Sequence, residues 1–226
     1  MTQQHGMAPR VLALDGPAGA GKSTVARRTA QRLGVMVLDT GAMYRAITVA
    51  CLDAGVALSD GGACEEIGAR SDVQLLDDGR VLLDGRDVST EIRTPEVTAA
   101  VSVVAAHPGV RSIMVSHQRQ WAVQHGAGVV EGRDIGTVVF PDAPIKNFLV
   151  ASAEERARRR SLDEAAAGRV TDPRSLLADI ERRDRADSER AASPLKPAPD
   201  AILLDTTGLA IDDVVDQIVQ RFRALS

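Results

Sequence analysis

The chain has 226 residues, enough for one well-buried core of the α/β class. Its net charge of -4 and pI near 5.6 argue against broad nucleic-acid binding, which needs a basic surface, so small molecules are the expected partners. Cys51 and Cys64 do not form a CxxC pair and the histidines lack metal-ligand spacing, which argues against a zinc site. The sequence shows no apolar leader or membrane-spanning stretch, and we expect a cytoplasmic protein that binds no membrane.

The N-terminal part of the sequence predicts a strand, a loop and a helix. An apolar run at residues 11–14 ends in a glycine-rich turn, after which residues 24–33 have helical spacing. A second apolar run at residues 35–38 precedes another helical segment. Asp39 or Thr40 is suited to cap that helix.

The middle of the sequence predicts an antiparallel insertion followed by helices. In residues 71–88, two short strand-like runs flank Asp78 and Gly79, a pair that favours a hairpin turn. Residues 95–124 then have a helical pattern that is interrupted at residues 107–109.

The C-terminal half returns to alternating strands and helices. Further apolar runs lie at residues 129–130, 148–150 and 202–204. Residues 156–190 are rich in arginine and acidic residues, which predicts exposed helices joined near Gly168 and Pro173. The five apolar runs, alternating with helical segments, predict a five-stranded parallel sheet covered by helices.

Residues 16–23 read GPAGAGKS and match the phosphate-binding pattern G-x-x-x-x-G-K-[ST]. Glycines let the backbone curl around phosphates, and the helix N-terminus that follows adds positive charge. Lys22 is expected to reach the β and γ phosphates of ATP, and the Ser23 hydroxyl to bind Mg²⁺. An ordinary glycine turn is the alternative, but the strand-loop-helix context disfavours it. The predicted cofactor-binding residues are Gly16, Pro17, Ala18, Gly19, Ala20, Gly21, Lys22, Ser23 and Thr24.

Two other nucleotide-binding classes can be tested on the sequence. A dinucleotide-binding fold requires the pattern G-x-G-x-x-[GA]. Gly19 and Gly21 match its first two glycines, but Thr24 stands where the pattern requires glycine or alanine. A GTPase requires the guanine-reading sequence NKxD, whereas the only asparagine, Asn147, is followed by Phe148. The alternative from another functional class is therefore a nucleotide-switched binding protein. Such a protein would lack the sequence that usually recognises guanine.

Three further clusters place arginine beside carboxylate, at residues 39–45, 131–137 and 182–190. Each of them alone is typical of a solvated surface or an ion pair. Together with the phosphate-binding loop they match a known pattern. The chain resembles the bacterial cytidylate kinases over nearly its whole length, through GPAGAGKST, LDTGAMYR, EIRTPEV, EGRDIGTVVFPDA, ASAEERARRR, ERRDRADSERAASPL and ILLDTTGL.

This resemblance implies a domain organisation and a reaction. A flexible segment at residues 1–9 would precede a single P-loop kinase domain at residues 10–226. That domain would include a nucleotide-binding subdomain at about 40–110, with the antiparallel insertion, and a helical lid at about 156–172. The implied reaction is transfer of the γ-phosphate of Mg-ATP to CMP and dCMP by a monomer. A kinase for another small acceptor, such as UMP, AMP or shikimate, is the alternative within the enzyme class.

The resemblance also implies the residues of the site. The acceptor would lie against Thr40, Tyr44 and Arg45, its cytosine beside Ser102, Arg111 and Asp134, its phosphate on Arg133, Arg183 and Arg190, and its ribose beside Asp187. The expected catalytic residues are Lys22, Arg133, Arg183 and the lid residues Arg158 and Arg159, and the expected metal-binding residues are Ser23 and Glu131. The acceptor phosphate is already ionised at neutral pH, so positioning and charge neutralisation are expected to replace a general base.

Overall fold

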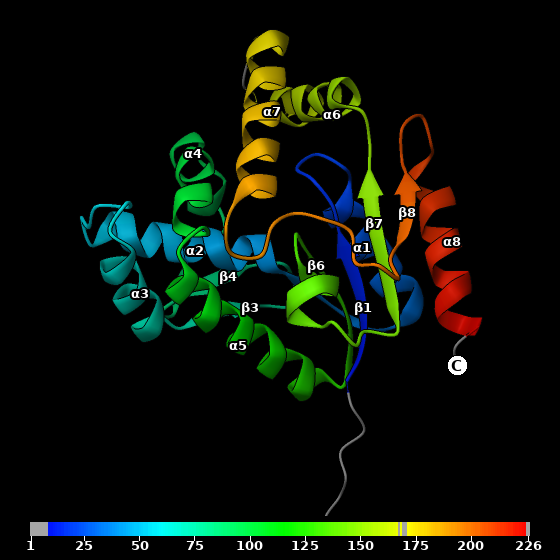
Figure 1. The fold of residues 1–226 in the computed structure, drawn as a ribbon, viewed down its shortest axis with the longest axis horizontal. Helices are drawn as coiled ribbons and strands as arrows, with labels where there is room; N and C mark the ends of the chain where they lie inside the picture. The colour runs from blue at the N-terminus through cyan, green and yellow to red at the C-terminus, as the bar shows by residue number, and fades with distance from the viewer. Residues whose placement is uncertain (1–8, 167, 169–170, 225–226) are drawn as a thin grey trace, which may run out of the picture.

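The computed structural model of the protein describes residues 9–166, 168 and 171–224. Its centre is a five-stranded parallel sheet with the strand order β2-β6-β1-β7-β8 (Figure 1). The strands are β1 (Arg10–Asp15), β2 (Met36–Asp39), β6 (Ala127–Gly132), β7 (Ile145–Val150) and β8 (Ile202–Asp205). Each of the five apolar runs in the sequence contributes one strand, which confirms the predicted parallel sheet.

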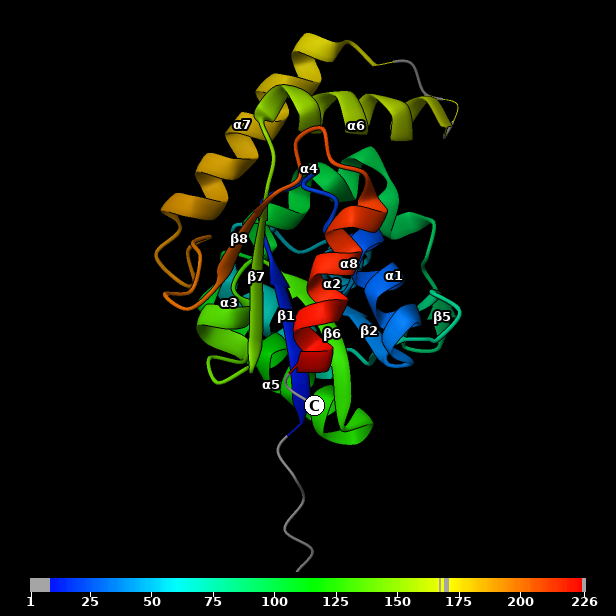
Figure 2. The same ribbon diagram turned by 90° about the vertical axis from the view of Figure 1, so that its right-hand side faces the viewer.

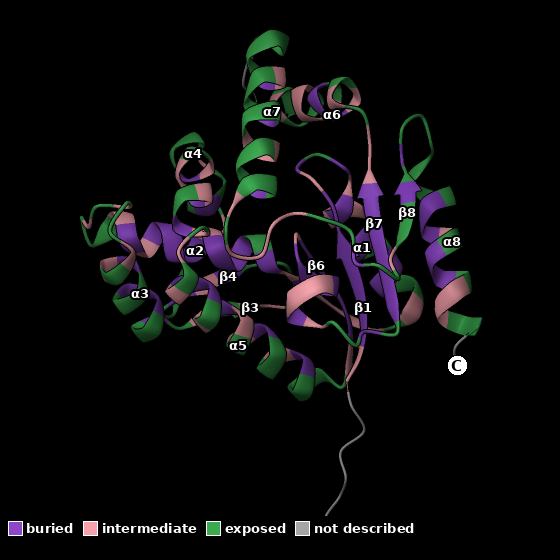
Figure 3. Ribbon diagram, in the orientation of Figure 1, coloured by how far each residue is buried: buried purple, intermediate pink, exposed green. Residues whose placement is uncertain are grey.

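Helices cover both faces of this sheet. Successive side chains of β1 point to opposite faces, as strand geometry requires. Leu12 and Leu14 pack with α1 (Lys22–Leu33) and α8 (Ile211–Ala224), which Figure 2 shows side by side in front of the sheet. Val11 and Ala13 pack with α2 (Thr40–Asp53) and α5 (Pro108–His125). The inner strands β1, β6 and β7 are therefore buried on both sides, which explains their continuous apolar sequences, whereas the edge strand β8 is largely exposed (Figure 3).

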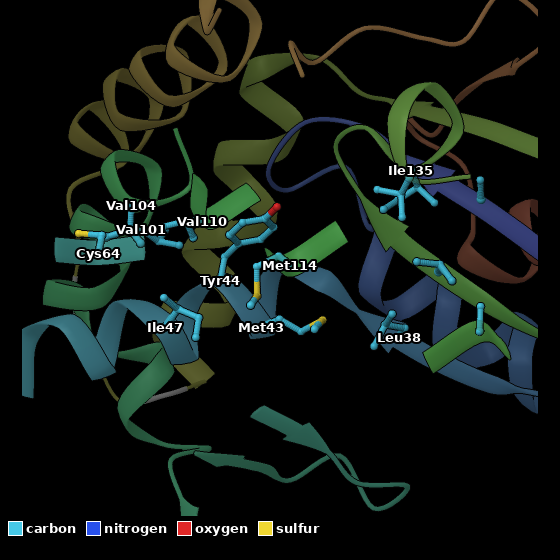
Figure 4. Packing of buried hydrophobic residues seen from close by; sticks show 14 of the residues in the cluster. Leu38, Met43, Tyr44, Ile47, Cys64, Val101, Val104, Val110, Met114 and Ile135 are labelled. Carbon is cyan, nitrogen blue, oxygen red and sulfur yellow. The ribbon is translucent and has the colours of Figure 1, made fainter. Parts of the chain in front are cut away.

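The contact between α2 and α5 forms a second part of the core beside the sheet. Met43, Tyr44 and Ile47 of α2 pack among residues of α5 that include Val110 and Met114 (Figure 4). The capping residue of α2 is Asp39, whose carboxylate accepts a hydrogen bond from the backbone of the first turn. The packing fixes α2, and with it the side chains that α2 presents to the end of the sheet.

The predicted antiparallel insertion follows α2. It contains α3 (Gly61–Arg70), β3 (Val73–Leu75), β4 (Val81–Leu83), β5 (Arg86–Asp87) and the 3-10 helix η1 (Glu91–Arg93). Strands β3 and β4 pair antiparallel around Asp78 and Gly79, and Gly79 has φ of +86°, so the predicted hairpin is confirmed. Strand β5 was not predicted, because two exposed polar residues carry no alternating pattern.

The predicted helical region after the insertion is also confirmed. It forms α4 (Pro95–Val104) and α5. The break lies at residues 105–107, slightly before the predicted interruption at 107–109, because Pro108 is the first residue of α5. Proline is the first residue of both helices, where its missing N–H group is not needed. No single helix in the described part of the chain is long and apolar enough to span a membrane. The pair α4 and α5 meets both criteria only when the two helices are counted together, and they are bent by 100° at the break between them.

Two helices extend beyond the carboxyl end of the sheet and pack against each other, α6 (Ala153–Ala166) and α7 (Pro173–Glu189) (Figure 1). Asp172 caps α7 by accepting a hydrogen bond from the Ser175 backbone at 3.1 Å. The predicted pair of helices joined near Gly168 and Pro173 is confirmed. Of the segments interpreted as the flexible N-terminus and the lid, residues 1–8, 167, 169 and 170 lie outside the described residues.

Candidate active site

The three sequence clusters and the glycine loop meet at the carboxyl end of the parallel sheet. β1 leads into residues 16–21 and β2 into the start of α2, and β6 ends at residues 131–132 and leads into residues 133–134. β7 leads into α6, which passes over the glycine loop (Figure 1). Ligands of parallel α/β sheets bind at this end, outside the carboxyl termini of the strands. The sequence clusters therefore belong to one site.

The glycine loop follows a path that only glycine permits. Gly16 has φ of +148°, and a Cβ atom there would lie 2.2 Å from the carbonyl oxygen of Leu149 in β7. Gly21 has φ of +89° and is the residue directly before α1. The loop consequently lies tightly against β7 and continues into a helix N-terminus, the arrangement in which backbone N–H groups bind phosphate.

Lys22 lies in the first turn of α1 and is buried, and its Nζ donates a hydrogen bond to the carbonyl of Pro17 at 2.8 Å. Burial lowers the pKa of Lys22, and the positive charge of Arg133 lowers it further, whereas Glu131 raises it. Lys22 therefore joins the glycine loop to residues of the β6 end. A bound anion at this point restores the favourable surroundings that the ammonium group lacks.

Glu131, at the end of β6, is a buried acidic residue beside Lys22. Burial raises its pKa, the charge of Asp39 adds to that effect, and Lys22 and a hydrogen bond with Ser23 oppose it. Among the described residues, no three His, Cys, Asp or Glu side chains are grouped to hold a metal ion. Magnesium binds oxygen ligands and retains water and phosphate, so one hydroxyl and one neighbouring carboxylate fit its requirements beside a nucleotide.

Thr40 and Arg45 lie on α2 at the edge of the site. The Thr40 hydroxyl donates to the backbone carbonyl of Glu131 at 2.7 Å, and Arg45 donates to the Ile92 carbonyl and the Thr98 hydroxyl, both at 2.8 Å. Burial lowers the pKa of Arg45 to about 10. These contacts tie the start of α2 to β6 and to the insertion, and they hold the Arg45 guanidinium at a partly desolvated position.

Two of the three predicted base-reading residues, Arg111 and Asp134, form a buried cluster with Tyr44 and Arg190. Arg111 of α5 pairs with Asp134 at 2.5 Å, and its guanidinium lies 5.4 Å from the centre of the Tyr44 ring. Arg190 lies 4.0 Å from Asp134. Within the described part of the chain, Nε of Arg111 and Nη2 of Arg190 are buried without a hydrogen-bond partner. Buried polar atoms without partners mark a place that a polar ligand or water completes.

Arg133, Arg183 and Asp187 form the side of the site nearest α7. Arg133 donates to Asp187 at 3.0 Å. Burial and then the charge of Arg133 lower the pKa of Arg183 to about 9, whereas Asp187 raises it. Burial acts to raise the pKa of Asp187, but Arg133 and Arg183 outweigh it and the pKa is lowered. The clustered guanidinium groups outnumber the carboxylate, which suits an anionic ligand.

Helix α6 directs its arginines to different surroundings. Arg156 is buried against the glycine loop, donates to the Ala18 carbonyl at 3.1 Å and pairs with Asp184 at 2.6 Å. Arg159 donates to the Thr206 carbonyl at 2.6 Å, and its Nη1 is 3.5 Å from the Cβ position of Gly21. Arg156 and Arg159 therefore both lie on the glycine loop.

The remaining arginines of α6 differ in exposure. The Arg158 side chain is 62% exposed and pairs with Glu155, so the structure does not bring it to the cluster. Arg160 was not among the predicted site residues. Burial is the main cause of the lowered pKa values of Arg45 and Arg183, and the positive charge of Arg160 contributes a smaller part of the lowering. The helical spacing of the sequence could have identified Arg160. Residues three and four positions after Arg156, which are Arg159 and Arg160, lie on the same face of the helix as Arg156.

Ser102 lies on α4, where it is half-buried. Its place at the base stays a prediction, as do the individual roles assigned to the other site residues. Of the predicted residues, the structure brings Lys22, Glu131, Arg133, Asp134, Arg183, Asp187 and Arg190 to one end of the sheet.

A tight glycine loop with a buried lysine, between a central parallel strand and a helix and facing a set of arginines, defines a P-loop phosphotransferase. The model of the cytidylate kinase family matches residues 12–224, and the chain belongs to that family. A cytidylate kinase of Desulforamulus reducens is 52% identical over 93% of this chain and 95% of its own length, and one of Rhodococcus opacus is 51% identical over 92% and 93%.

Two further comparisons concern a fused relative and a solved structure. A bifunctional pantoate ligase/cytidylate kinase of Synechococcus elongatus is 52% identical, over 94% of this chain but 42% of that protein. A crystal structure of an uncharacterized protein from Eubacterium ventriosum aligns with a TM-score of 0.52 at 12% identity, covering 93% of this chain and 96% of the other. The latter similarity extends to the fold alone.

Proposed function

We propose that this protein transfers the γ-phosphate of ATP to CMP and dCMP, producing ADP with CDP or dCDP. Family membership supports this reaction. The observation that carries the choice of acceptor is the buried Arg111–Asp134 pair, which adjoins Nη2 of Arg190, a buried atom without a hydrogen-bond partner among the described residues.

The chemistry of that pair suits cytosine. The 4-amino group of cytosine donates hydrogen bonds that the Asp134 carboxylate accepts, and the neighbouring ring nitrogen and carbonyl accept from guanidinium groups. Uracil has a carbonyl in place of the amino group, so it would present an acceptor to a carboxylate. A buried mismatch of this kind costs about 1–3 kcal/mol, roughly ten- to a hundredfold in affinity. We propose that Ser102 contributes to the same edge and Asp187 binds the ribose.

Phosphoryl transfer requires two anionic groups to approach each other. Lys22 and the loop at residues 16–24 are suited to bind the donor phosphates, and Thr40, Arg45, Arg133 and Arg183 are suited to bind the acceptor phosphate. Fixed cations stabilise the charge that develops between them, and no general base is needed. From α6, we propose that Arg159 and Arg160 approach the phosphates, with Arg160 replacing the exposed Arg158 of the sequence interpretation.

Magnesium fits the same proposal. Ser23 and Glu131 interact with each other next to Lys22, and both supply the oxygen ligands that this ion prefers. The Ser23 hydroxyl would bind the ion directly, and Glu131 would orient its water. A bound Mg²⁺ supplies additional positive charge to the phosphates.

The proposal extends to the setting of the enzyme. We propose a cytoplasmic monomer whose partners are Mg-ATP, CMP and dCMP rather than nucleic acid or a membrane. The net charge of -4 supports the exclusion of nucleic acid. Light scattering coupled to gel filtration measures the monomer mass directly.

A coupled ADP-release assay tests the reaction, with Mg-ATP and separate additions of CMP, dCMP, UMP, AMP and shikimate. We expect ADP production with CMP and dCMP, and at least tenfold lower kcat/KM with UMP or AMP. Equal rates with all the nucleotides, or none with CMP, would contradict the proposal. ADP production that is slow and independent of every acceptor would instead indicate a nucleotide-switched binding protein.

A further inference from the structure

Asp15 is a buried carboxylate that joins the strand before the glycine loop to the segment after β6. It is the last residue of β1, directly before the glycine loop, and it is 4% exposed. Its Oδ1 accepts a hydrogen bond from the backbone N–H of Ile135 at 2.8 Å, and its Oδ2 accepts one from Gly136 at 2.7 Å. Both carboxylate oxygens of a donor-side residue are therefore held by a segment of the acceptor side.

That segment is the π-helical turn η2 (Ile135–Val139), which follows Asp134 directly. The first N–H groups of a helix lack partners inside the helix, and an aspartate just before the helix ordinarily accepts from them. Asp134 occupies this position, yet its side chain makes no capping hydrogen bond. Asp15 binds the free N–H groups instead, from a strand that is distant in the sequence.

The orientation of the Asp134 carboxylate follows from the fact that Asp15, and not Asp134, accepts hydrogen bonds from the first N–H groups of η2. Because Asp15 caps η2, the Asp134 carboxylate is released from its own helix and pairs with Arg111 at 2.5 Å, with Arg190 at 4.0 Å. The arrangement also depends on glycine, since a Cβ atom on Gly136 would lie 3.1 Å from Cδ of Lys146 and 3.4 Å from Oδ2 of Asp15.

We propose that Asp15 is a positioning residue for base selection, which caps η2 from β1 and thereby keeps the Asp134 carboxylate turned toward the acceptor base. This inference rests on the proposed recognition of cytosine by Asp134. The substrate class that it serves is a nucleoside monophosphate whose base presents an amino group.

The electrostatic surroundings agree with this role. Burial raises the pKa of Asp15 to about 6 against the effect of its two backbone hydrogen bonds, and the charge of Asp134 raises it while that of Lys22 lowers it. Burying a carboxylate is unfavourable, and hydrogen bonds to both oxygens offset only part of the cost. An uncharged residue would be less costly at a position with a purely space-filling role.

The first test is Asp15→Asn. Asparagine offers one oxygen and one NH₂ group, so one of the two η2 N–H groups loses its acceptor and faces a donor. Asp134 then becomes the available cap for η2. We expect the KM for CMP to rise roughly tenfold and the preference for CMP over UMP to fall by a similar factor, with the KM for ATP within about threefold of wild type. Equal weakening of ATP and CMP, with the preference unchanged, would overturn the inference.

A double-mutant cycle identifies the residue through which Asp15 acts. If it acts through Asp134, the variant Asp15→Asn/Asp134→Ala has the same preference for CMP over UMP as Asp134→Ala alone. Independent, additive losses would contradict the inference. Asp200→Asn is the matched control, because Asp200 pairs with Lys146, whose side chain packs against Gly136. It should leave the preference intact.

Hydrogen exchange on the wild-type protein tests the cap without any variant, should Asp15→Asn fail to fold. We expect the amides of Ile135 and Gly136 to be protected to the same degree as those of β1, and exchange at the rate of an open loop would overturn the cap. The two proposals fail differently. If the wild-type protein shows no preference for CMP, both the proposed recognition of cytosine and the role of Asp15 are contradicted. If the wild-type protein prefers CMP and the Asp15→Asn variant keeps this preference, only the role of Asp15 is contradicted.

Discussion

At the scale of single residues, Lys22 connects the two halves of the site. Its ammonium group is buried and donates a hydrogen bond to the Pro17 carbonyl, close to Glu131 and to the positive charge of Arg133. A buried cation in such surroundings is stabilised when a phosphate group binds next to it. The stabilisation is larger when the phosphate group carries more negative charge, as it does in the transition state. Lys22 is thus suited to favour the transition state over the free enzyme.

Lys22→Ala should lower kcat by on the order of a hundred- to a thousandfold or more, the usual effect of removing one fixed cation or donor from a transition state. The fold should persist, because the hydrogen bond that the ammonium group makes with a described residue lies within the glycine loop. The assay is coupled ADP release, with circular dichroism as the check on folding. Lys196→Ala, at an exposed lysine, is the control. Normal turnover of Lys22→Ala would remove the glycine loop from the mechanism.

Asp15 also predicts a pH dependence of stability. Its pKa rises from 3.8 in the unfolded chain to about 6 on folding, mainly through burial, so the folded protein binds this proton more tightly. Its contribution to stability is therefore largest below pH 3.8 and is lost as the pH rises through about 6. The unfolding free energy of wild type minus that of Asp15→Asn should be greater at pH 5 than at pH 7.5, by on the order of 1 kcal/mol. Urea titrations measure it, and an opposite trend would contradict the raised pKa.

At the scale of elements, local patterns predicted much of the architecture. The five strands follow from apolar runs, the glycine loop from its motif, and the β3–β4 hairpin from Asp78 and Gly79. Contacts between distant segments were not predictable in this way. The cap of η2 by Asp15 joins residues 120 positions apart, and the roles of the α6 arginines depend on how Arg156 docks this helix on the glycine loop.

The rotation of α6 leads to a prediction about its arginines. Arg160→Ala should lower kcat by roughly tenfold or more, because it removes one of the converging cations near Arg45 and Arg183. Arg158→Ala is the matched control on the same helix, and it should stay within about threefold of wild type because the Arg158 side chain is 62% exposed and pairs only with Glu155 among the described residues. The reverse order of effects would show that α6 rotates when nucleotides bind.

At the scale of the whole molecule, the site gathers cations from four separate elements. Arg45 comes from α2, Arg133 from the end of β6, Arg160 from α6 and Arg183 from α7. After burial, these charges lower the pKa of Arg45 and of Arg183, so they repel one another when no anion is bound. Nucleotide phosphates should therefore draw the central sheet, α2 and the α6–α7 pair together.

A compound that joins adenosine and cytidine through five phosphates would occupy both halves of the site at once. At a thousandfold excess over its Kd it should stabilise the fold by about 4 kcal/mol, which raises the Tm of a chain of this size by roughly 10 °C. The rise should shrink as salt is added, because salt screens the attraction between phosphates and guanidinium groups. At the same concentration of the compound, Arg160→Ala should show a smaller rise and Arg158→Ala the full one. A rise that is equal in all three proteins and insensitive to salt would mean that the nucleosides, and not the converging arginines, hold the elements together.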